Sequence, residues 1–324
     1  MTTEDVLSSD GIIFAVPNFS DGSRVDVIEA VSAPFRTRDG VKLLDLAPDR
    51  DFNRTVITAI GRPAPLYEAL LEMTGEAVSR IDMNGQTGAH PRIGAQDTIP
   101  VFPFRGISLE ECNEFVRILG DEIHRQLNLP VYFSGETAST PQRSDLAFLR
   151  AGQYEGLAQS MLDPERSPDL GDGVPHPTAG AIILSAGTRP LVACNVLLAT
   201  TDLAVAKSIA QMVRGPSGGF STIRAVGMAF EERDCVAVSM NMFDYEATPL
   251  HRVVELIRSE ARRHNVRVLG TQLVGVVPLA ALLGAADFYL QLDGFERSQV
   301  LEEHLEDVYA VGGHAAVAAD AHSL

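Results

Sequence analysis

Short apolar runs alternate with segments of helical periodicity along this chain, and the alternation restricts it to layered mixtures of helices and sheets. Apolar and β-branched runs predict strands at 12–16, 41–46, 55–60, 99–104, 131–134, 181–184, 191–198, 223–230, 236–243, 266–270 and 272–277. Apolar residues at helical spacing predict helices over 25–35, 67–79, 108–126, 203–213 and 250–263, with two short helices between 141 and 162. Ser108 and Glu111 form a capping-box pattern that opens one of these helices.

The segment 167–180, SPDLGDGVPHPTAG, breaks the periodicity with glycines and prolines and predicts a connection between two subdomains. The predicted N-terminal subdomain spans 1–178, the C-terminal subdomain spans 179–295, and a fraying tail spans 296–324. The order βαββαβ in the second half indicates a ferredoxin-like sandwich with a mostly antiparallel sheet. The predicted fold class is therefore α+β, with two α/β sandwiches and a cleft between them.

Charge and composition argue against several classes of function. The net charge of −17 makes nucleic acid or an anionic membrane an unsuitable partner. No apolar run is long enough to cross a bilayer, and the acidic start MTTEDVLSSDG is unlike a signal peptide. Cys112, Cys194 and Cys235 lack metal spacing and predict small buried side chains rather than disulfides. Together these features predict a cytoplasmic protein.

The segment 81–106, IDMNGQTGAHPRIGAQDTIPVFPFRG, lacks apolar periodicity in its first half, and its glycines and prolines constrain the backbone around His90. Pro91 follows the histidine directly, and Arg92 lies one residue further on. This loop combines a proton carrier, an anion-binding guanidinium and amide side chains. It predicts a functional site at His90, with a hydrogen-bonded structural histidine as the alternative interpretation.

The sequence GAHPRIGAQD resembles the His-Pro-Arg signature of the formiminotransferase (glutamate formimidoyltransferase) family. Other segments resemble the same family in the same order: FAVPNFSDG, LLDLAPDRDFNRTVITAIG, LPVYFSGETA, LRAGQYEGL and TQLVGVVPLAALL. The resemblance covers residues 12–287. It implies transfer of a formimino group from N-formiminoglutamate to N5 of tetrahydrofolate, which gives L-glutamate and 5-formiminotetrahydrofolate. Tetrahydrofolate is then the co-substrate and no metal is needed.

The same resemblance implies a homodimer. The protein is expected to act without the helical cyclodeaminase domain that is fused in some relatives, and its folate product is expected to pass to a separate cyclodeaminase. Two other functions stay open at this stage. One is a transferase of the same fold that uses a different formimino or formyl donor, and the other is a non-catalytic folate-binding module.

In the implied reaction N5 loses a proton as it attacks the formimino carbon, and the departing glutamate nitrogen gains one. A single imidazole with a pKa near neutrality can perform both transfers in turn, so His90 is the predicted general acid and base. Asp45 and Asp49 are predicted to polarise the imidazole or the donor, with a solvated acidic loop as the alternative. Phe52 stands where relatives often carry a histidine, which leaves the choice of aspartate open.

Both substrates carry glutamate carboxylates, which favour bidentate arginine. The predicted substrate-binding and folate-binding residues come from the family-like segments: Asn18, Asn53, Arg54, Arg92, Gly94, Gly152, Gln153, Tyr154, Glu155 and Arg189. For the arginines a surface or structural role is the alternative. Tyr154 is predicted to stack on the pterin or aminobenzoyl ring, or else to be a core tyrosine. The lysines that follow this loop in some relatives are missing, which argues against tight binding of a polyglutamate tail.

Overall fold

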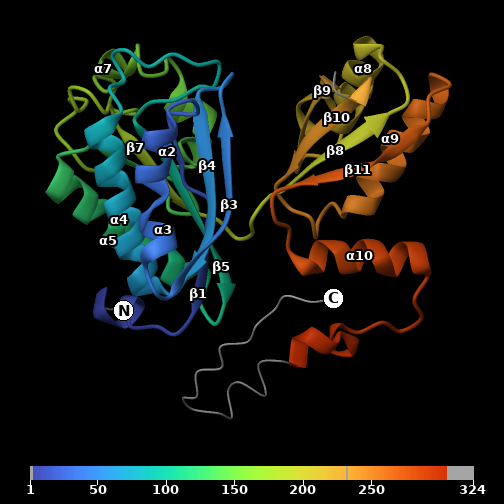
Figure 1. Ribbon diagram of the computed structural model, residues 1–324, viewed down its shortest axis with the longest axis horizontal. Helices are drawn as coiled ribbons and strands as arrows, with labels where there is room; N and C mark the ends of the chain where they lie inside the picture. Colours follow the sequence, from blue (N-terminus) through green and yellow to red (C-terminus); the bar gives the residue numbers. More distant parts are fainter. Residues whose placement is uncertain (1–2, 231–232, 305–324) are drawn as a thin grey trace.

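The computed structural model describes residues 3–230 and 233–304, and within them the chain builds two β-sheets with helices packed on them (Figure 1). The first sheet has the order β1-β4-β2-β5-β7-β6, with β3 added on β4. The pairs β5–β7 and β6–β7 are parallel and the other pairs are antiparallel. Its strands are β1 (Ile12–Ala15), β2 (Asn18–Phe19), β3 (Val41–Asp49), β4 (Arg54–Gly61), β5 (Gln96–Arg105), β6 (Val131–Gly135) and β7 (Ile182–Ala186).

The second sheet has the order β11-β8-β10-β9, and all of its pairs are antiparallel. Its chain order is strand, helix, strand, strand, helix, strand, as the sequence predicts. The elements are β8 (Val192–Leu198), α8 (Leu203–Val213), β9 (Ile223–Phe230), β10 (Cys235–Met242), α9 (Leu250–Arg263) and β11 (Val268–Val274). The α+β class is therefore confirmed.

Helices pack on the outer side of each sheet. In Figure 1, α4 (Pro63–Arg80) and α5 (Leu109–Leu127) lie on the side of the first sheet that faces away from the second sheet, and α9 lies on the opposite outer side. The helix α5 begins with the predicted capping box: Glu111 N donates to Ser108 Oγ (3.1 Å), and Ser108 N donates to the Glu111 carboxylate (2.7 Å). Its buried residues recur at helical spacing, so one face enters the core: Cys112, Phe115, Val116, Leu119 and Ile123.

The remaining helices are short or lie at the ends of the two layers. They are α1 (Thr3–Leu7), α2 (Val25–Ser32), α3 (Pro34–Thr37), α6 (Leu146–Arg150), α7 (Leu157–Ser160) and α10 (Leu279–Leu290), with 3₁₀ turns at Pro141–Ser144, Gly215–Ser217, Arg297–Gln299 and Leu301–His304. The three cysteines are buried and free. In the part of the chain that the structure describes, no helix combines the length and apolar character needed to cross a membrane.

The first sheet has an apolar face and a polar face. Ile57 and Ala59 of β4 belong to the core under the helices. Arg54, Val56 and Thr58 alternate with them along the strand and therefore project from the opposite face. Ladder register places Asn18, Thr98 and Asp45 on that same polar face, because Asn18 is paired with Val56 and Thr98, and Asp45 with Thr58. The polar side of the sheet is thus available for a site.

The chain leaves the first sheet for the second at a later residue than the sequence predicts. β7 is the last strand of the first sheet, paired in parallel with β5 and β6, so the chain crosses between sheets after Ala186 rather than near 178. The segment 167–180 instead stays on the first subdomain, where Leu170 bridges to Val131 and Gly180 bridges to Gly94. Glycines and prolines therefore mark an irregular loop here and not the connection between sheets.

Two further expectations are adjusted. The expected strands 266–270 and 272–277 are replaced by the single strand β11 (Val268–Val274), which continues through the expected break because Thr271 pairs with Val196 of β8. Of the expected tail, 296–304 contains the two 3₁₀ turns, and 305–324 lie outside the described residues.

Gly94 is required where β5 and β7 begin to pair. A Cβ on Gly94 would lie 1.9 Å from the carbonyl oxygen of Ala181. We expect Gly94→Ala to lower the free energy of unfolding by at least about 2 kcal/mol, because backbone on both sides must move. Gly284→Ala in α10, where nothing lies within 4 Å, is the matched control and is expected to be neutral or stabilising by up to about 1 kcal/mol. Urea unfolding measures both, and equal stability of the two variants would contradict the packing argument.

Candidate functional site

The turn between β3 and β4 is tied to two other loops by Asn53. Its Oδ1 accepts from Gly22 N (3.0 Å), and its Nδ2 donates to Thr87 O (2.7 Å). Gln86 Nε2 donates to the Asn53 carbonyl (3.1 Å), and Asn53 itself has a left-handed backbone conformation (φ 48°). Asn53 is a predicted binding residue, but its side-chain amide is used to hold the loop before His90 in place.

His90 is half-buried and contacts the same turn on two sides. Arg54 Nη1 donates a hydrogen bond to His90 Nε2, and the ring of Phe52 packs edge-on to the imidazole with centroids 6.1 Å apart. His90 Nδ1 is buried, with no hydrogen-bond partner of ordinary geometry among the described residues. A neutral imidazole whose Nε2 accepts carries its proton on Nδ1, so the contact with Arg54 assigns the tautomer.

The surroundings of His90 favour the neutral ring. Burial, followed by the positive charges of Arg54 and Arg150 and a smaller effect of Arg92, lowers the pKa of His90 from 6.5 to about 3, against an opposing effect of the Pro91 backbone. His90 is therefore uncharged at neutral pH and has a lone pair for accepting a proton. That lone pair lies on Nε2, where it accepts the hydrogen bond from Arg54.

Arg54 has charged neighbours and no direct carboxylate partner among the described residues. Burial and the charge of Arg150 lower the pKa of Arg54, while Asp97 and Asp49 raise it. Asp97 is fully buried, pairs with Arg150 and accepts from Ile93 N (2.9 Å), so its carboxylate is already used. Arg150 is one of the arginines in the family-like segments that could bind a substrate carboxylate, but here it is paired with Asp97, for which no separate role is predicted. A carboxylate that begins an otherwise apolar strand is the sequence signal that points to Asp97.

The structure places Asp49 beside Arg54, whereas Asp45 lies opposite Thr58, four residues before Asp49 on β3. Asp49 is paired with Arg54 in the β3–β4 ladder, and its Oδ1 accepts from the backbone of the following turn. Asp45 lies further along β3, where its Oδ2 is 3.7 Å from the position that a Cβ on Gly275 would occupy. No contact between either aspartate and His90 is found within the described residues, so their catalytic role stays a prediction.

Arg92 is a buried cation whose five N–H donors are all used inside the protein. Its Nε donates to Gln86 Oε1 (2.8 Å) and its Nη2 to Gln86 O (3.0 Å). Nη1 and Nη2 form a bidentate pair with Glu155 (2.9 and 2.7 Å), and Nη1 also donates to Gln153 Oε1 (3.2 Å). Arg92, Gln153 and Glu155 therefore connect two loops to each other. This arrangement favours a structural role over substrate binding.

The turn that contains Tyr154 borders a cavity beside the loop that precedes His90. Gly152 and Gln153 have left-handed backbones (φ 88° and 54°), and Tyr154 Oη donates to Asn84 Oδ1 (3.0 Å). The cavity has a volume of about 420 Å³, and Asn84, Gln86, Thr87, Tyr154, Glu155 and His176 are among its lining residues. His90 does not line it. The predicted folate loop and the His90 loop thus meet at this cavity.

Asn18 forms a buried amide network with β5. Its Nδ2 donates to Thr98 Oγ1, and Gln96 Nε2 donates to Asn18 O (2.9 Å) and Thr98 O (3.2 Å). Asn18 Oδ1 and Gln96 Oε1 are buried and have no hydrogen-bond partner in the described parts of the chain. Buried acceptors of this kind suit a site for N–H donors. Gly94, by contrast, has the packing function described above.

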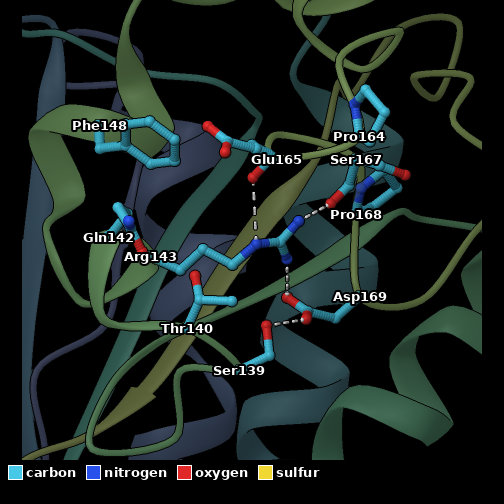
Figure 2. A pocket seen from close by; sticks show the side chains of 10 residues that line it. All are labelled: Ser139, Thr140, Gln142, Arg143, Phe148, Pro164, Glu165, Ser167, Pro168 and Asp169. Atoms are coloured by element: carbon cyan, nitrogen blue, oxygen red, sulfur yellow. Dashed lines mark hydrogen bonds and ion pairs between the residues drawn. The ribbon is translucent and has the colours of Figure 1, made fainter.

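Arg189 and Arg143 are neutralised elsewhere. Arg189 pairs with Asp244 (3.5 Å) and Glu246 (2.6 Å), which ties the connection between sheets to the second subdomain. Figure 2 shows Arg143 in another cavity, of about 540 Å³, with its guanidinium directed at Asp169 (2.8 Å) and at two backbone carbonyls. Ser139 donates to the other oxygen of Asp169 (2.8 Å), so this cluster is satisfied without a ligand.

The sequence matches two family models that divide the chain where it passes between sheets. Residues 12–187 match the formiminotransferase domain, N-terminal subdomain, and residues 193–309 match the formiminotransferase domain. The chain therefore belongs to the formiminotransferase family, whose His-Pro-Arg signature its loop at His90 resembles. The first match ends at residue 187 and the second begins at residue 193, so the boundary between them falls just after Ala186, the end of β7.

Individual relatives cover nearly the whole chain. It is 39% identical over 296 residues to "Glutamate formimidoyltransferase" of Streptococcus pyogenes serotype M1, which covers 91% of this chain and 98% of that protein. It is 36% identical to the protein of the same name from Thermoplasma acidophilum, with 91% and 97% covered. It is 40% identical to "Formimidoyltransferase-cyclodeaminase" of Mus musculus, where the match covers 90% of this chain and 54% of the relative.

Arg92→Gln tests whether Arg92 is structural. We expect it to lower the free energy of unfolding by about 2 kcal/mol, because Gln86, Gln153 and the partly exposed Glu155 lose a shared partner. Arg125→Gln on the surface of α5, where the arginine pairs with Glu122 alone, is the control and should change stability by less than about 0.5 kcal/mol. Unchanged unfolding together with a raised KM would instead identify Arg92 as a substrate ligand.

Proposed function

We propose that the protein is a glutamate formimidoyltransferase that transfers the formimino group of N-formimino-L-glutamate to N5 of tetrahydrofolate. The observation that carries this proposal is the match over almost the full length of two relatives that bear that name. Tetrahydrofolate is the co-substrate. The supporting feature of the site is a neutral, half-buried imidazole at His90, flanked by the guanidinium groups of Arg54 and Arg150.

In the proposed reaction His90 moves one proton between two nitrogens. As N5 of tetrahydrofolate bonds to the formimino carbon, His90 Nε2 takes the N5 proton. The bond from that carbon to the glutamate nitrogen then breaks, and the imidazolium returns the proton to the departing nitrogen. The products are 5-formiminotetrahydrofolate and L-glutamate, and His90 is neutral again. The low pKa of His90 keeps the ring unprotonated at neutral pH, so Nε2 carries a lone pair.

Arg54 is the proposed ligand for a glutamate carboxylate of the donor. It is half-buried, and within the described residues its hydrogen bond to His90 leaves other N–H groups unused. Arg92 and Arg189 are already paired with carboxylates. Asn18 Oδ1, on the polar face of the sheet, and the buried Gln96 Oε1 have no hydrogen-bond partner among the described residues and suit the formimino N–H groups. Asp45 and Asp49, on the polar face of the same sheet, are proposed to polarise the formimino group of the donor.

The folate is proposed to occupy the cavity beside Tyr154 and to extend into a cleft between the two subdomains. Three observations support this placement. Tyr154 and the loop that precedes His90 line one cavity. Asp45 approaches Gly275, so the first sheet reaches the loop after β11 of the second. The strand order β11-β8-β10-β9 is consistent with a ferredoxin-like second subdomain that presents its uncovered face to the first.

The proposal extends to a cytoplasmic homodimer whose product is consumed by a separate cyclodeaminase. The exposed apolar residues of α10 support self-association, because a helix with so few charges is usually covered. They are Leu279, Leu282, Phe288, Tyr289 and Leu290. Light scattering that reports a monomer at working concentration would contradict this part of the proposal and leave the activity untouched.

Steady-state assays with N-formiminoglutamate and tetrahydrofolate test the activity. We expect 5-formiminotetrahydrofolate to form, and we expect His90→Ala to lower kcat by about 10²–10⁴-fold because the proton carrier is lost. His264→Ala, at the exposed end of α9, is the control and should retain full activity. Turnover with a formyl donor alone, or none with either donor, would refute the proposed function. Full activity in His90→Ala would refute the assignment of the proton carrier.

A further inference from the structure

The contact between Arg54 and His90 occupies the nitrogen that the reaction needs. Arg54 Nη1 donates to His90 Nε2, so the lone pair of the neutral ring is engaged. The other ring nitrogen, Nδ1, carries the proton and is buried. In this arrangement the imidazole cannot accept a proton from a substrate unless the guanidinium moves. The described structure is thus a resting arrangement of the two side chains.

Arg54 is the site arginine whose charge is not cancelled by a direct carboxylate contact among the described residues. Asp97 pairs with Arg150, and Asp49 makes its short contact with the backbone of the turn. Arg54 is therefore a half-buried cation bonded to a neutral group. A carboxylate offers it a stronger, charge-assisted hydrogen bond than an imidazole does. An incoming substrate carboxylate would compete with His90 for the same donors.

We propose that Arg54 is a carboxylate-responsive gate on His90, which withholds the Nε2 lone pair in the free protein and releases it when the glutamate carboxylate of a substrate draws the guanidinium away. The inference rests on the proposed function for the identity of that carboxylate. Arg54 is in this view a positioning residue as well as a substrate ligand, and it couples donor binding to the state of the base.

The positive charges around His90 make its pKa depend on the position of Arg54. Arg54 from β4, Arg150 from α6 and Arg92 from the loop of His90 itself all disfavour the imidazolium, whereas the carboxylates Asp97 and Asp49 act on Arg54. A base with a pKa of about 3 is a poor proton carrier at neutral pH. A carboxylate on Arg54 removes one of the largest opposing charges and raises the pKa of His90 toward the ordinary range. The base becomes effective when donor is bound.

Histidine ¹⁵N NMR of the whole protein tests this gate, with L-glutamate as the probe and His90→Gln to assign the signals. In the free protein we expect a neutral ring with an unprotonated, hydrogen-bonded Nε2 between about pH 5 and pH 7, a range in which an ordinary histidine titrates. Saturating glutamate should break the Nε2 contact and shift the titration of His90 to higher pH, because it offsets the charge of Arg54. No change at His90 up to the solubility limit of glutamate would overturn the proposal.

Arg54→Gln supplies the second arm. In this variant we expect His90 to titrate higher than in the parent without any ligand and to stop responding to glutamate. Arg54→Lys keeps the charge and should retain part of the response. Arg80→Gln, which removes a surface pair with Glu76 on α4, is the control and should behave as the parent. An unchanged His90 signal in folded Arg54→Gln would also overturn the gate. A normal NMR response without turnover would count against the proposed function alone.

Discussion

Arg92 is the buried cation around which the loops of the site are assembled. A guanidinium that leaves water must have its charge and its five donors satisfied, and the partners come from two distant parts of the chain. Gln86 and the carbonyl of the same residue approach from one side, and Gln153 and Glu155 from the other. Because His90 stands two residues from Arg92, the position of the imidazole follows from this network.

The arginines discussed above fall into two groups, according to whether a carboxylate of the protein contacts them. Arg92, Arg143 and Arg189 each meet a carboxylate within the protein, so their charge is used to join segments. Arg54 instead meets a neutral imidazole, and it shares its surroundings with Arg150. In a protein with a net charge of −17, a guanidinium that has no direct carboxylate partner among the described residues is where an anionic substrate would be attracted.

Periodicity predicted most helices and strands, because burial of one face imposes a repeat that the sequence records directly. Periodicity failed where the structure depends on pairing between strands that are far apart in the sequence. The strand β7 follows an irregular loop, and its place in the first sheet depends on parallel partners that are far away in sequence. The continuity of β11 across residue 271, where a break was expected, depends on its pairing with β8. Neither feature leaves a local signal.

The features of the candidate site also separate into those that the sequence predicts and those that depend on folding. Sequence by itself determined the α+β class, the constrained loop around His90 and the resemblance to one family, since these depend on residue types and their local spacing. Tertiary structure alone decided that Arg54 occupies His90 Nε2, that Arg92 is enclosed by carboxylate and amide partners, and that Asp97 lies beside Arg150. The physical reason is that a charged side chain acquires its role from the groups that neutralise it, and those groups are brought together only by folding.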